Sequence, residues 1–276
     1  KPTDIMNVSF TDPKDATFTK IYVGGGVQWV KLNPGMEKAA AFLETHRYAA
    51  LMGGSMAFTK MEGTTVNIKD KIAYSALQNV QSSMVANDKA WDANANISIP
   101  AKLKAGVVLA HTLTAGLKDT SGAAINSEWM PASSKTLLAG EDIAADALGN
   151  LGNPDKIANP DNLKFSEKLR TLFIGEDSSQ HVNNFVWAYN VDTKTLSRLV
   201  SMPAGAEATG LSVADDINGW TYITSNFQHP GDWDSALHGK VKPTLDALVR
   251  ANYKDRFAAA VGYLTADATS VKLGKV

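Results

Sequence analysis

Residues 159–213, NPDNLKFSEKLRTLFIGEDSSQHVNNFVWAYNVDTKTLSRLVSMPAGAEATGLSV, contain four short β-type runs in succession. The runs are NLKF (162–165), RTLFI (170–174), NFVWAY (184–189) and TLSRLV (195–200). Each run has the length of a strand and is bounded by polar residues, glycine or proline. NVDTK (190–194) has the composition of a tight turn between the last two runs. Four short antiparallel strands joined in this way are typical of one β-propeller blade.

A similar order of features occurs on either side of this stretch. Glu62, Asp161 and Glu207 each stand at the start of a β-type run, and each run is followed by further runs of strand length. The following runs outside 159–213 are 71–77, 106–113, 219–225 and 258–264. The spacing predicts an all-β protein with about three blades of a partial β-propeller, interrupted by helical and loop insertions.

Other segments of the chain complete this prediction. We expect two strands within 17–32, helices at 36–51, 141–148 and 243–252, a loop at 78–100, and a remnant of a strand at 271–273. Residues 1–276 are predicted to form a single propeller region, with an insertion-rich segment at 78–158.

Composition excludes several classes of function. The chain has 276 residues, a net charge of −1 and no basic block, which argues against nucleic acid or an anionic membrane as the main partner. No apolar run approaches the length of a membrane span. Cysteine is absent, so neither disulfides nor thiolate metal ligands come from this chain. The first residue is Lys1 with no signal-like segment after it, so we expect that an upstream segment was removed or that the chain is a fragment.

Acidic residues fall at the starts and ends of the predicted strands. In a propeller, the innermost strands converge on a central channel, so residues at the same end of each strand meet although they are far apart in sequence. Converging carboxylates repel one another unless a cation lies among them, and carboxylate and amide oxygens are the ligands that calcium prefers. The candidate ligands are Glu62, Asp161, Asn162, Glu176, Asp177 and Glu207. The alternative is that Asp161, Asn162 and Asp177 are ordinary turn residues.

Several segments, taken in order, resemble the PhoX-type alkaline phosphatases, a family of exported bacterial β-propeller enzymes. The segments are HRYAALMGGSMAFTKMEG (46–63), NPDNLKF (159–165), LFIGEDSSQHVNNFVWAYNVDT (172–193), PAGAEATG (203–210) and FQHPGDW (227–233). The resemblance extends from about residue 40 to about residue 264. It implies hydrolysis of phosphomonoesters, a metal cluster with calcium and iron, and a periplasmic or extracellular location.

Members of that family are much longer than this chain, so the chain resembles the C-terminal half of one. The family's iron cluster also uses a cysteine ligand, which this chain lacks. We therefore expect a companion polypeptide that carries the remaining blades, or a homo-oligomer, because the outer blades would otherwise present unpaired strand edges.

Two further residues are candidate substrate contacts. Arg47 can bind phosphate oxygens in a bidentate manner, although an arginine on a helix surface is an equally good interpretation. His229, in the turn-like sequence QHPGD, could contact a substrate. His181 is more simply a structural hydrogen-bonding residue, and Trp187 and Tyr189 are more simply core residues of the blade.

Three functions remain open from the sequence. The first is a metal-dependent phosphomonoester hydrolase, or part of one, in which the metal cluster holds phosphate oxygens and activates a water molecule. The second is a non-catalytic propeller that calcium stabilises and whose surface binds a partner. The third is another calcium-containing propeller hydrolase, such as a lactonase.

Overall fold

The computed structural model describes residues 1–23, 26–119, 121–256 and 258–269. The chain divides into two compact units, each made of two segments. The first unit comprises Lys1–Lys60 and Val80–Lys102, and the second comprises Met61–Asn79 and Leu103–Val276. Both units are built on antiparallel sheets, so the prediction of a mostly β protein is confirmed. That residues 1–276 form one propeller region stays a prediction.

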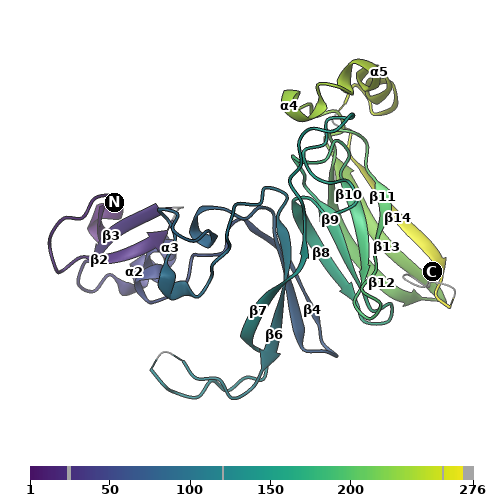
Figure 1. The fold of residues 1–276 in the computed structure, drawn as a ribbon. Helices are drawn as coiled ribbons and strands as arrows, with labels where there is room; N and C mark the ends of the chain where they lie inside the picture. Colours follow the sequence, from purple (N-terminus) through teal and green to yellow (C-terminus); the bar gives the residue numbers. More distant parts are fainter. Residues whose placement is uncertain (24–25, 120, 257, 270–276) are drawn as a thin grey trace. The chain divides into compact units, whose positions relative to one another are not determined.

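The first unit contains a three-stranded sheet in the order β1-β3-β2, with short helices beside it (Figure 1). Its elements are α1 (Pro2–Ile5), β1 (Met6–Ser9), β2 (Thr19–Val23), β3 (Gly26–Leu32), α2 (Glu37–Leu43) and α3 (Thr45–Leu51). The two strands predicted within 17–32 are β2 and β3, and the helix predicted at 36–51 is divided in two at Glu44. Val30 and Ala40 are fully buried where sheet and helix meet.

The second unit contains three antiparallel sheets with the strand orders β4-β5-β6-β7, β8-β9-β10-β11 and β12-β13-β14. In each sheet, neighbouring strands are also consecutive in the sequence. The first sheet comprises β4 (Met61–Asn67), β5 (Ile72–Leu77), β6 (Val107–Thr114) and β7 (Met130–Ala139). The second comprises β8 (Pro160–Ser166), β9 (Thr171–Glu176), β10 (Phe185–Asn190) and β11 (Leu196–Ser201). The third comprises β12 (Glu207–Ile217), β13 (Trp220–Gln228) and β14 (Ala260–Asp267).

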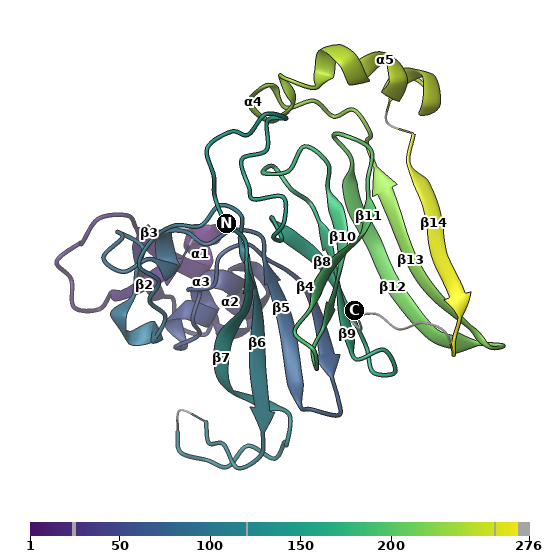
Figure 2. The same ribbon diagram turned by 45° about the vertical axis from the view of Figure 1, so that its right-hand side comes forward.

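The sheets of the second unit stack through their first strands. β8 contacts both β4 and β12, so it lies between them (Figure 2). Two glycines allow the close approach of the backbones. A Cβ atom added at Gly63 of β4 would lie 2.4 Å from the carbonyl oxygen of Asp161, and one at Gly175 would lie 2.9 Å from that of Ala208. Any larger residue at Gly63 would therefore force β4 away from β8.

The middle sheet is buried on both faces. Tyr74 of the first sheet packs in one cluster with Phe165 and Trp187, and Trp187 is only 2% exposed. On the other face, Phe173 packs in a cluster with Ile223 of the third sheet. β9 and β10 are almost entirely buried, whereas β11 at the edge of the sheet is half-buried to exposed. Each of the four strands predicted within residues 159–213 is confirmed.

The prediction of a helix at 141–148 is wrong, because these residues form an irregular loop. The composition EDIAADAL suits a helix, but two aspartates bind backbone N–H groups of a non-helical chain instead. The Asp146 Oδ1 atom accepts hydrogen bonds from the backbone of Leu148, Gly149 and Asn150. The Asp142 carboxylate accepts from the backbone N–H groups of residues 104 and 105.

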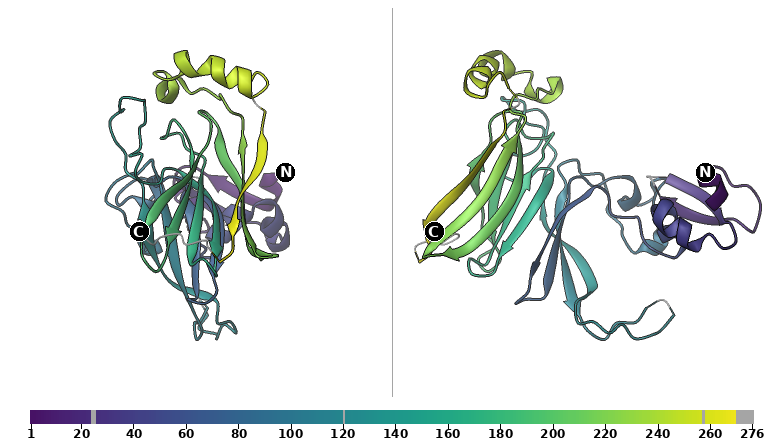
Figure 3. Two further views of the ribbon diagram at one scale, coloured as in Figure 1. Left: turned by 90° about the vertical axis from the view of Figure 1, so that its right-hand side faces the viewer. Right: turned by 180° about the vertical axis from the view of Figure 1, so that it is seen from behind.

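Other predictions can be compared with the elements directly. The C-terminal helix is confirmed as α5 (Lys242–Asn252), preceded by a short helix α4 (Ser235–His238) (Figure 3). The predicted loop at 78–100 contains the 3₁₀ turns η1 (Ser82–Met84) and η2 (Ala93–Ala95) and an isolated β-bridge between Val85 and Ile99. The strand predicted at 271–273 lies outside the described residues. None of the helices that the structure describes combines the length and apolar character that crossing a membrane requires.

Candidate functional site

Three of the predicted carboxylates meet in the second unit. Asp161 lies at the start of β8, Asp177 directly after β9, and Glu207 at the start of β12. One oxygen atom from each lies within 4.8 Å of the others, and all three side chains are half-buried. Asp161 and Asp177 come together because Pro160 pairs with Glu176 in the β8–β9 register. Glu207 joins them because β12 packs beside β8.

Each of the three carboxylates accepts a hydrogen bond from an amide side chain. Asn162 Nδ2 donates to Asp161 Oδ1 over 3.2 Å, and Gln78 Nε2 donates to Asp177 Oδ2 over 2.9 Å. Gln228 Nε2 donates to Glu207 Oε2. Such donors fix the orientation of a carboxylate and offset part of its charge without neutralising it. Asn162, predicted as a ligand, thus lies at the cluster with its amide nitrogen on Asp161.

The spacing of the carboxylates fits a calcium-sized cation. Oxygen ligands lie about 2.3–2.6 Å from Ca²⁺, so two ligands on opposite sides of the ion are at most about 5 Å apart. The three oxygen atoms all lie within 4.8 Å of one another, so one such cation could contact all of them. Three carboxylates held this close repel one another, and a divalent cation among them would remove the repulsion. These hard oxygen donors favour calcium, magnesium or manganese over softer metals.

His229 stands beside the cluster. Its Nδ1 atom lies 3.1 Å from the carbonyl oxygen of Gly205, and its Nε2 atom lies 3.5 Å from Glu207 Oε2. The ring is held there by a turn in which His229 has φ of +42° and Asp232 N donates to the His229 carbonyl oxygen. The predicted substrate contact His229 is therefore next to the predicted ligand Glu207.

A small polar cavity of about 220 Å³ opens at Asp177, Glu207 and His229. Its other polar lining residues are Gln78, Ser178, Ser179, Asn184, Asp232, Asp234 and His238. Of the described residues that line it, none is lysine or arginine. An anion such as phosphate would therefore be repelled by the carboxylates unless a cation were bound with it.

Glu176 does not belong to the cluster. Its Oε1 atom accepts hydrogen bonds from the Ala158 N–H over 2.8 Å and from Trp187 Nε1 over 2.6 Å. Its Oε2 atom lies 3.0 Å from His181 Nδ1 and accepts from the Phe185 N–H. Glu176 and His181 are both fully buried. Both oxygens of Glu176 thus have hydrogen-bond partners in the core, and its assignment as a metal ligand stays a prediction. The contacts of His181 are those of a structural hydrogen-bonding residue.

Two other predicted site residues are not members of the acidic group. Glu62 is on β4, and the acidic group found among the described residues does not include it. Arg47 belongs to α3 of the first unit, where its guanidinium binds Glu44 Oε2 at 2.6 Å and Gln28 Oε1 at 2.7 Å. Its contacts there are those of a structural arginine.

Sequence reasoning missed the amide donors Gln78 and Gln228. The internal repeat contained the signal for Gln78. Leu77, just before Gln78, pairs with Met61 at the start of β4. In the same way the residue before Asp177 pairs with the start of β8. Gln228 pairs directly with Glu207. A polar residue at the end of each second strand was thus as regular a feature as the acidic residue at the start of each first strand.

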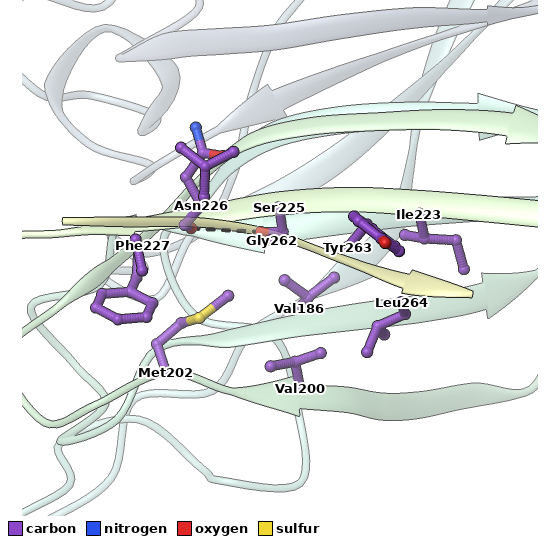
Figure 4. Close-up of a pocket in the computed structure, with 12 residues that line it drawn as sticks. Val186, Val200, Met202, Ile223, Ser225, Asn226, Phe227, Gly262, Tyr263 and Leu264 are labelled. Atoms are coloured by element: carbon purple, nitrogen blue, oxygen red, sulfur yellow. Dashed lines mark hydrogen bonds between the residues drawn. The ribbon is translucent and has the colours of Figure 1, made fainter.

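A second cavity of about 220 Å³ in this unit is apolar (Figure 4). It lies between the middle and third sheets and is lined by residues such as Val186, Met202, Phe227 and Leu264. None of the described residues that line it is an aspartate, glutamate, histidine, lysine or arginine. It therefore offers no acid, base or metal ligand set, and the polar cavity is the better candidate site.

Comparison of the chain with protein-family models, with curated proteins and with solved structures finds no match. The resemblance to PhoX-type phosphatases stays a prediction.

Proposed function

We propose that the second unit is a run of three β-propeller blades whose carboxylate cluster binds a divalent cation and hydrolyses phosphomonoesters. The propeller proposal is supported by three successive sheets in which each strand pairs with the next, and by first strands that lie side by side. Inner strands of adjacent blades have this arrangement in a propeller. The third sheet has three strands where the others have four.

The observation that carries the functional proposal is the meeting of Asp161, Asp177 and Glu207. Two of these carboxylates, Asp177 and Glu207, line a polar cavity together with His229. The carboxylates would hold the cation, and the amides of Gln78 and Gln228 would keep two of them in position. A bound cation would supply charge stabilisation for phosphate oxygens and would lower the pKa of a water ligand. His229 would contact the phosphate or the leaving group from the cavity wall.

Calcium is the proposed resident ion, because all three donors are hard oxygens. Iron, which the resemblance implies, would need further ligands, and this chain has no cysteine to provide one. Export to the periplasm or the extracellular space and a companion polypeptide are supported by the resemblance alone.

One observation favours the non-catalytic alternative. The three carboxylates come from the middle and third sheets, so a cation among them would join two sheets even without any chemistry. In that case the ion would act as a structural clamp, and the cavity would bind no phosphate ester.

The first test measures cation binding. Isothermal titration of Ca²⁺ into chelator-treated protein should give one site that is lost in Glu207→Gln and Asp177→Asn. Glu62→Gln is the matched control, because Glu62 begins the neighbouring first strand but lies outside the cluster. Binding that survives both cluster variants, or that Glu62→Gln abolishes, would place the cation elsewhere.

The second test measures turnover. With calcium, and with calcium plus iron, p-nitrophenyl phosphate should be hydrolysed by the wild type and not by Glu207→Gln. Calcium binding without phosphate release would favour the structural clamp, and release from lactones alone would favour a lactonase. His229→Ala should lower turnover while calcium binding remains, which separates substrate contact from metal binding.

A further inference from the structure

The polar cavity beside the carboxylate cluster carries more acidic groups than the cluster itself contributes. Besides Asp177 and Glu207, the cavity is lined by the carboxylates of Asp232 and Asp234. Both lie in the segment between β13 and α4. Neither belongs to the acidic group that could hold a metal among the described residues. A cation bound by the cluster would therefore leave two further negative charges on the cavity wall.

Both of these carboxylates have oxygen atoms available to a ligand. Asp234 Oδ1 accepts hydrogen bonds from two backbone N–H groups of α4, whereas its Oδ2 accepts none within the described part of the chain. The side chain of Asp232 is 67% exposed, and its one ion-pair contact there is with His229 Nδ1 at 3.9 Å. That nitrogen lies closer to the Gly205 carbonyl oxygen, at 3.1 Å. Asp232 is thus left without a close cationic partner in the described structure.

Gln78 adds an uncharged acceptor to the same wall. The residue is only 9% exposed, and its Nε2 atom donates to Asp177 Oδ2 over 2.9 Å and to the Asp177 carbonyl oxygen over 3.2 Å. These two bonds fix which end of the amide faces Asp177. The other end, Oε1, accepts no hydrogen bond from the described residues, yet it is not closed off from solvent. A buried amide oxygen in this state needs a donor or a cation in the cavity.

The nitrogen donors of the wall are bound to protein acceptors instead. Asn184 Nδ2 donates to the Ser178 carbonyl oxygen over 3.2 Å, and His238 Nε2 lies 3.2 Å from the Val182 carbonyl oxygen. Of the described residues that line the cavity, none is lysine, arginine, phenylalanine, tyrosine or tryptophan. The cavity therefore offers acceptors and negative charge. Its complement is a small group with positive charge and several donors, and a primary ammonium group has three donors and no acceptor.

We propose that this cavity selects phosphomonoesters of short amino alcohols, with the phosphate on the cluster-bound cation and the primary ammonium group on Asp232 and Asp234. The inference rests on the proposed function, since it names the substrate class of the same site. His229 has Glu207 Oε2 at 3.5 Å from one ring nitrogen and Asp232 Oδ2 at 3.9 Å from the other. The two ends of the site are thus separated by one imidazole ring, which suits a two-carbon chain such as that of phosphoethanolamine. A cavity of about 220 Å³ also suits a small leaving group.

The ammonium group selects the substrate and takes no part in the bond changes. Water attacks phosphorus, and the bond between phosphorus and the ester oxygen breaks. The phosphate keeps the oxygen of the water, and the amino alcohol leaves with a proton from that water on its own oxygen. A trimethylammonium group, as in phosphocholine, has no N–H to donate and is recognised by aromatic side chains. The described wall has none, so the selection should favour a primary ammonium group.

The test compares two esters that differ in the charged group. Phosphoethanolamine carries an ammonium group where 2-hydroxyethyl phosphate carries a neutral hydroxyl, and phosphate release is measured for both with calcium and with calcium plus iron. We expect kcat/KM to be about five- to tenfold higher for phosphoethanolamine, through a lower KM, because each exposed ion pair contributes modestly. Phosphocholine should be no better a substrate than 2-hydroxyethyl phosphate.

Variants assign the preference to the two carboxylates. Asp232→Asn and Asp234→Asn should each reduce the preference for phosphoethanolamine, and the double variant should bring the ratio of the two kcat/KM values close to one. Asparagine caps a helix as well as aspartate does, so Asp234→Asn keeps α4 in place. Asp155→Asn is the matched control, because Asp155 is 81% exposed outside the cavity and loses the same charge. It should retain the full preference.

The outcomes separate this inference from the proposed function. Equal kcat/KM for the two esters, or a preference that survives the double variant, would overturn the inference while the proposed hydrolysis stands. If neither ester is hydrolysed, the proposed hydrolysis fails, and isothermal titration of both esters into the calcium-treated chain decides the ammonium site. Tighter binding of phosphoethanolamine that the double variant loses would support that site, and equal binding or none would refute it. A second calcium ion per chain that disappears in Asp232→Asn would also refute it, because metal would then occupy the proposed ammonium site.

Discussion

The buried carboxylate of Glu176 joins several parts of the middle sheet. It accepts hydrogen bonds from two backbone N–H groups and from Trp187 Nε1, and it faces the His181 ring. The two backbone N–H groups and the Trp187 indole are donors, so a carboxylate can accept from all three. An amide in its place would turn its NH2 group toward at least one of these N–H donors, which have no acceptor capacity.

We therefore expect Glu176→Gln to lower the free energy of unfolding by about 1–3 kcal/mol, the cost of leaving a buried N–H donor without an acceptor. The measurement is urea unfolding followed by tryptophan fluorescence. Glu37→Gln, at an exposed position on α2, should change the same quantity by less than about 0.5 kcal/mol. A loss of under about 1 kcal/mol at Glu176 would show that the four contacts contribute little net stability.

His238 is held as a neutral ring. Its Nε2 atom lies 3.2 Å from the Val182 carbonyl oxygen, and its Nδ1 atom accepts a hydrogen bond from the Asp234 N–H over 3.0 Å. Burial lowers the pKa of His238 below its ordinary value, because a charged imidazolium would lose its hydration. Burial also lowers the pKa of His111. Protonating His238 would break the bond at Nδ1.

The sign of the pH dependence follows from these pKa shifts. The unfolded chain takes up a proton at a higher pH than the folded chain, so the contribution of a neutral His238 is complete above about pH 6.5 and declines below it. The free energy of unfolding should fall between about pH 7.5 and about pH 5.5. His238→Gln should show a smaller fall over that interval, even if it is less stable throughout. Parallel pH profiles for the two proteins would exclude His238 as the source.

At the scale of elements, Arg170 ties together the turns at one end of the first two sheets. Its guanidinium binds the carboxylate of Asp70, which lies in the β4–β5 turn. It also binds Asp192, in the β10–β11 turn, with 3.0 Å between Arg170 Nη2 and Asp192 Oδ1. These bonds lower the pKa of both carboxyl groups. A planar guanidinium can serve two carboxylates at once, whereas a lysine ammonium has no such fork.

Arg170→Ala should lower the free energy of unfolding by on the order of 1–2 kcal/mol, because hydrogen bonds to charged groups are lost at a site that is only 18% exposed. Thermal unfolding should show the loss as a lower melting temperature. Lys168→Ala is the control from the same turn, since Lys168 forms one exposed ion pair with Asp216. Equal effects of the two substitutions would mean that the network adds nothing beyond a surface pair.

The elements that sequence could predict are those with their own hydrophobic pattern. β9 and β10 are continuous apolar runs buried on both faces, which marks them as strands without any knowledge of their partners. β7, with the sequence MPASSKTLLA, has no such pattern and is mostly exposed, so its existence depends on pairing with β6. The prediction of a helix at 141–148 was wrong for the opposite reason. The segment has a local preference for helix, but Asp142 and Asp146 accept hydrogen bonds from backbone N–H groups in a non-helical conformation.

The candidate site was predictable in part, and strand alternation explains the limit. Glu176 and Asp177 are adjacent in the sequence, and both were candidate ligands. Successive side chains of a strand point to opposite sides, so one of the two enters the core beside Trp187 and the other reaches the cluster. The sequence GED alone does not reveal which of the two acidic side chains enters the core, because that depends on the pairing register with β8. The grouping of Asp177 with Asp161 and Glu207, in place of Glu62, depends in turn on the order of the stacked sheets.

At the scale of the whole molecule, a cation in the cluster would couple the middle and third sheets to one another. Ligand that binds only the folded state stabilises it by about 2.7 kcal/mol at a concentration 100 times its dissociation constant. For a unit of this size, saturating calcium should then raise the melting temperature by roughly 5–10 °C. Excess chelator should reverse the increase.

The variants decide whether this stabilisation comes from the proposed cluster. Glu207→Gln removes one charge from the group and should abolish most of the calcium-dependent increase, because Asp161 and Asp177 alone form a weaker site. Chelated wild type and chelated Glu207→Gln should melt at similar temperatures, or the variant slightly higher, since without the ion the three carboxylates only repel one another. Glu62→Gln should retain the full increase. A calcium effect of equal size in all three proteins would mean that the ion stabilises the fold from another site.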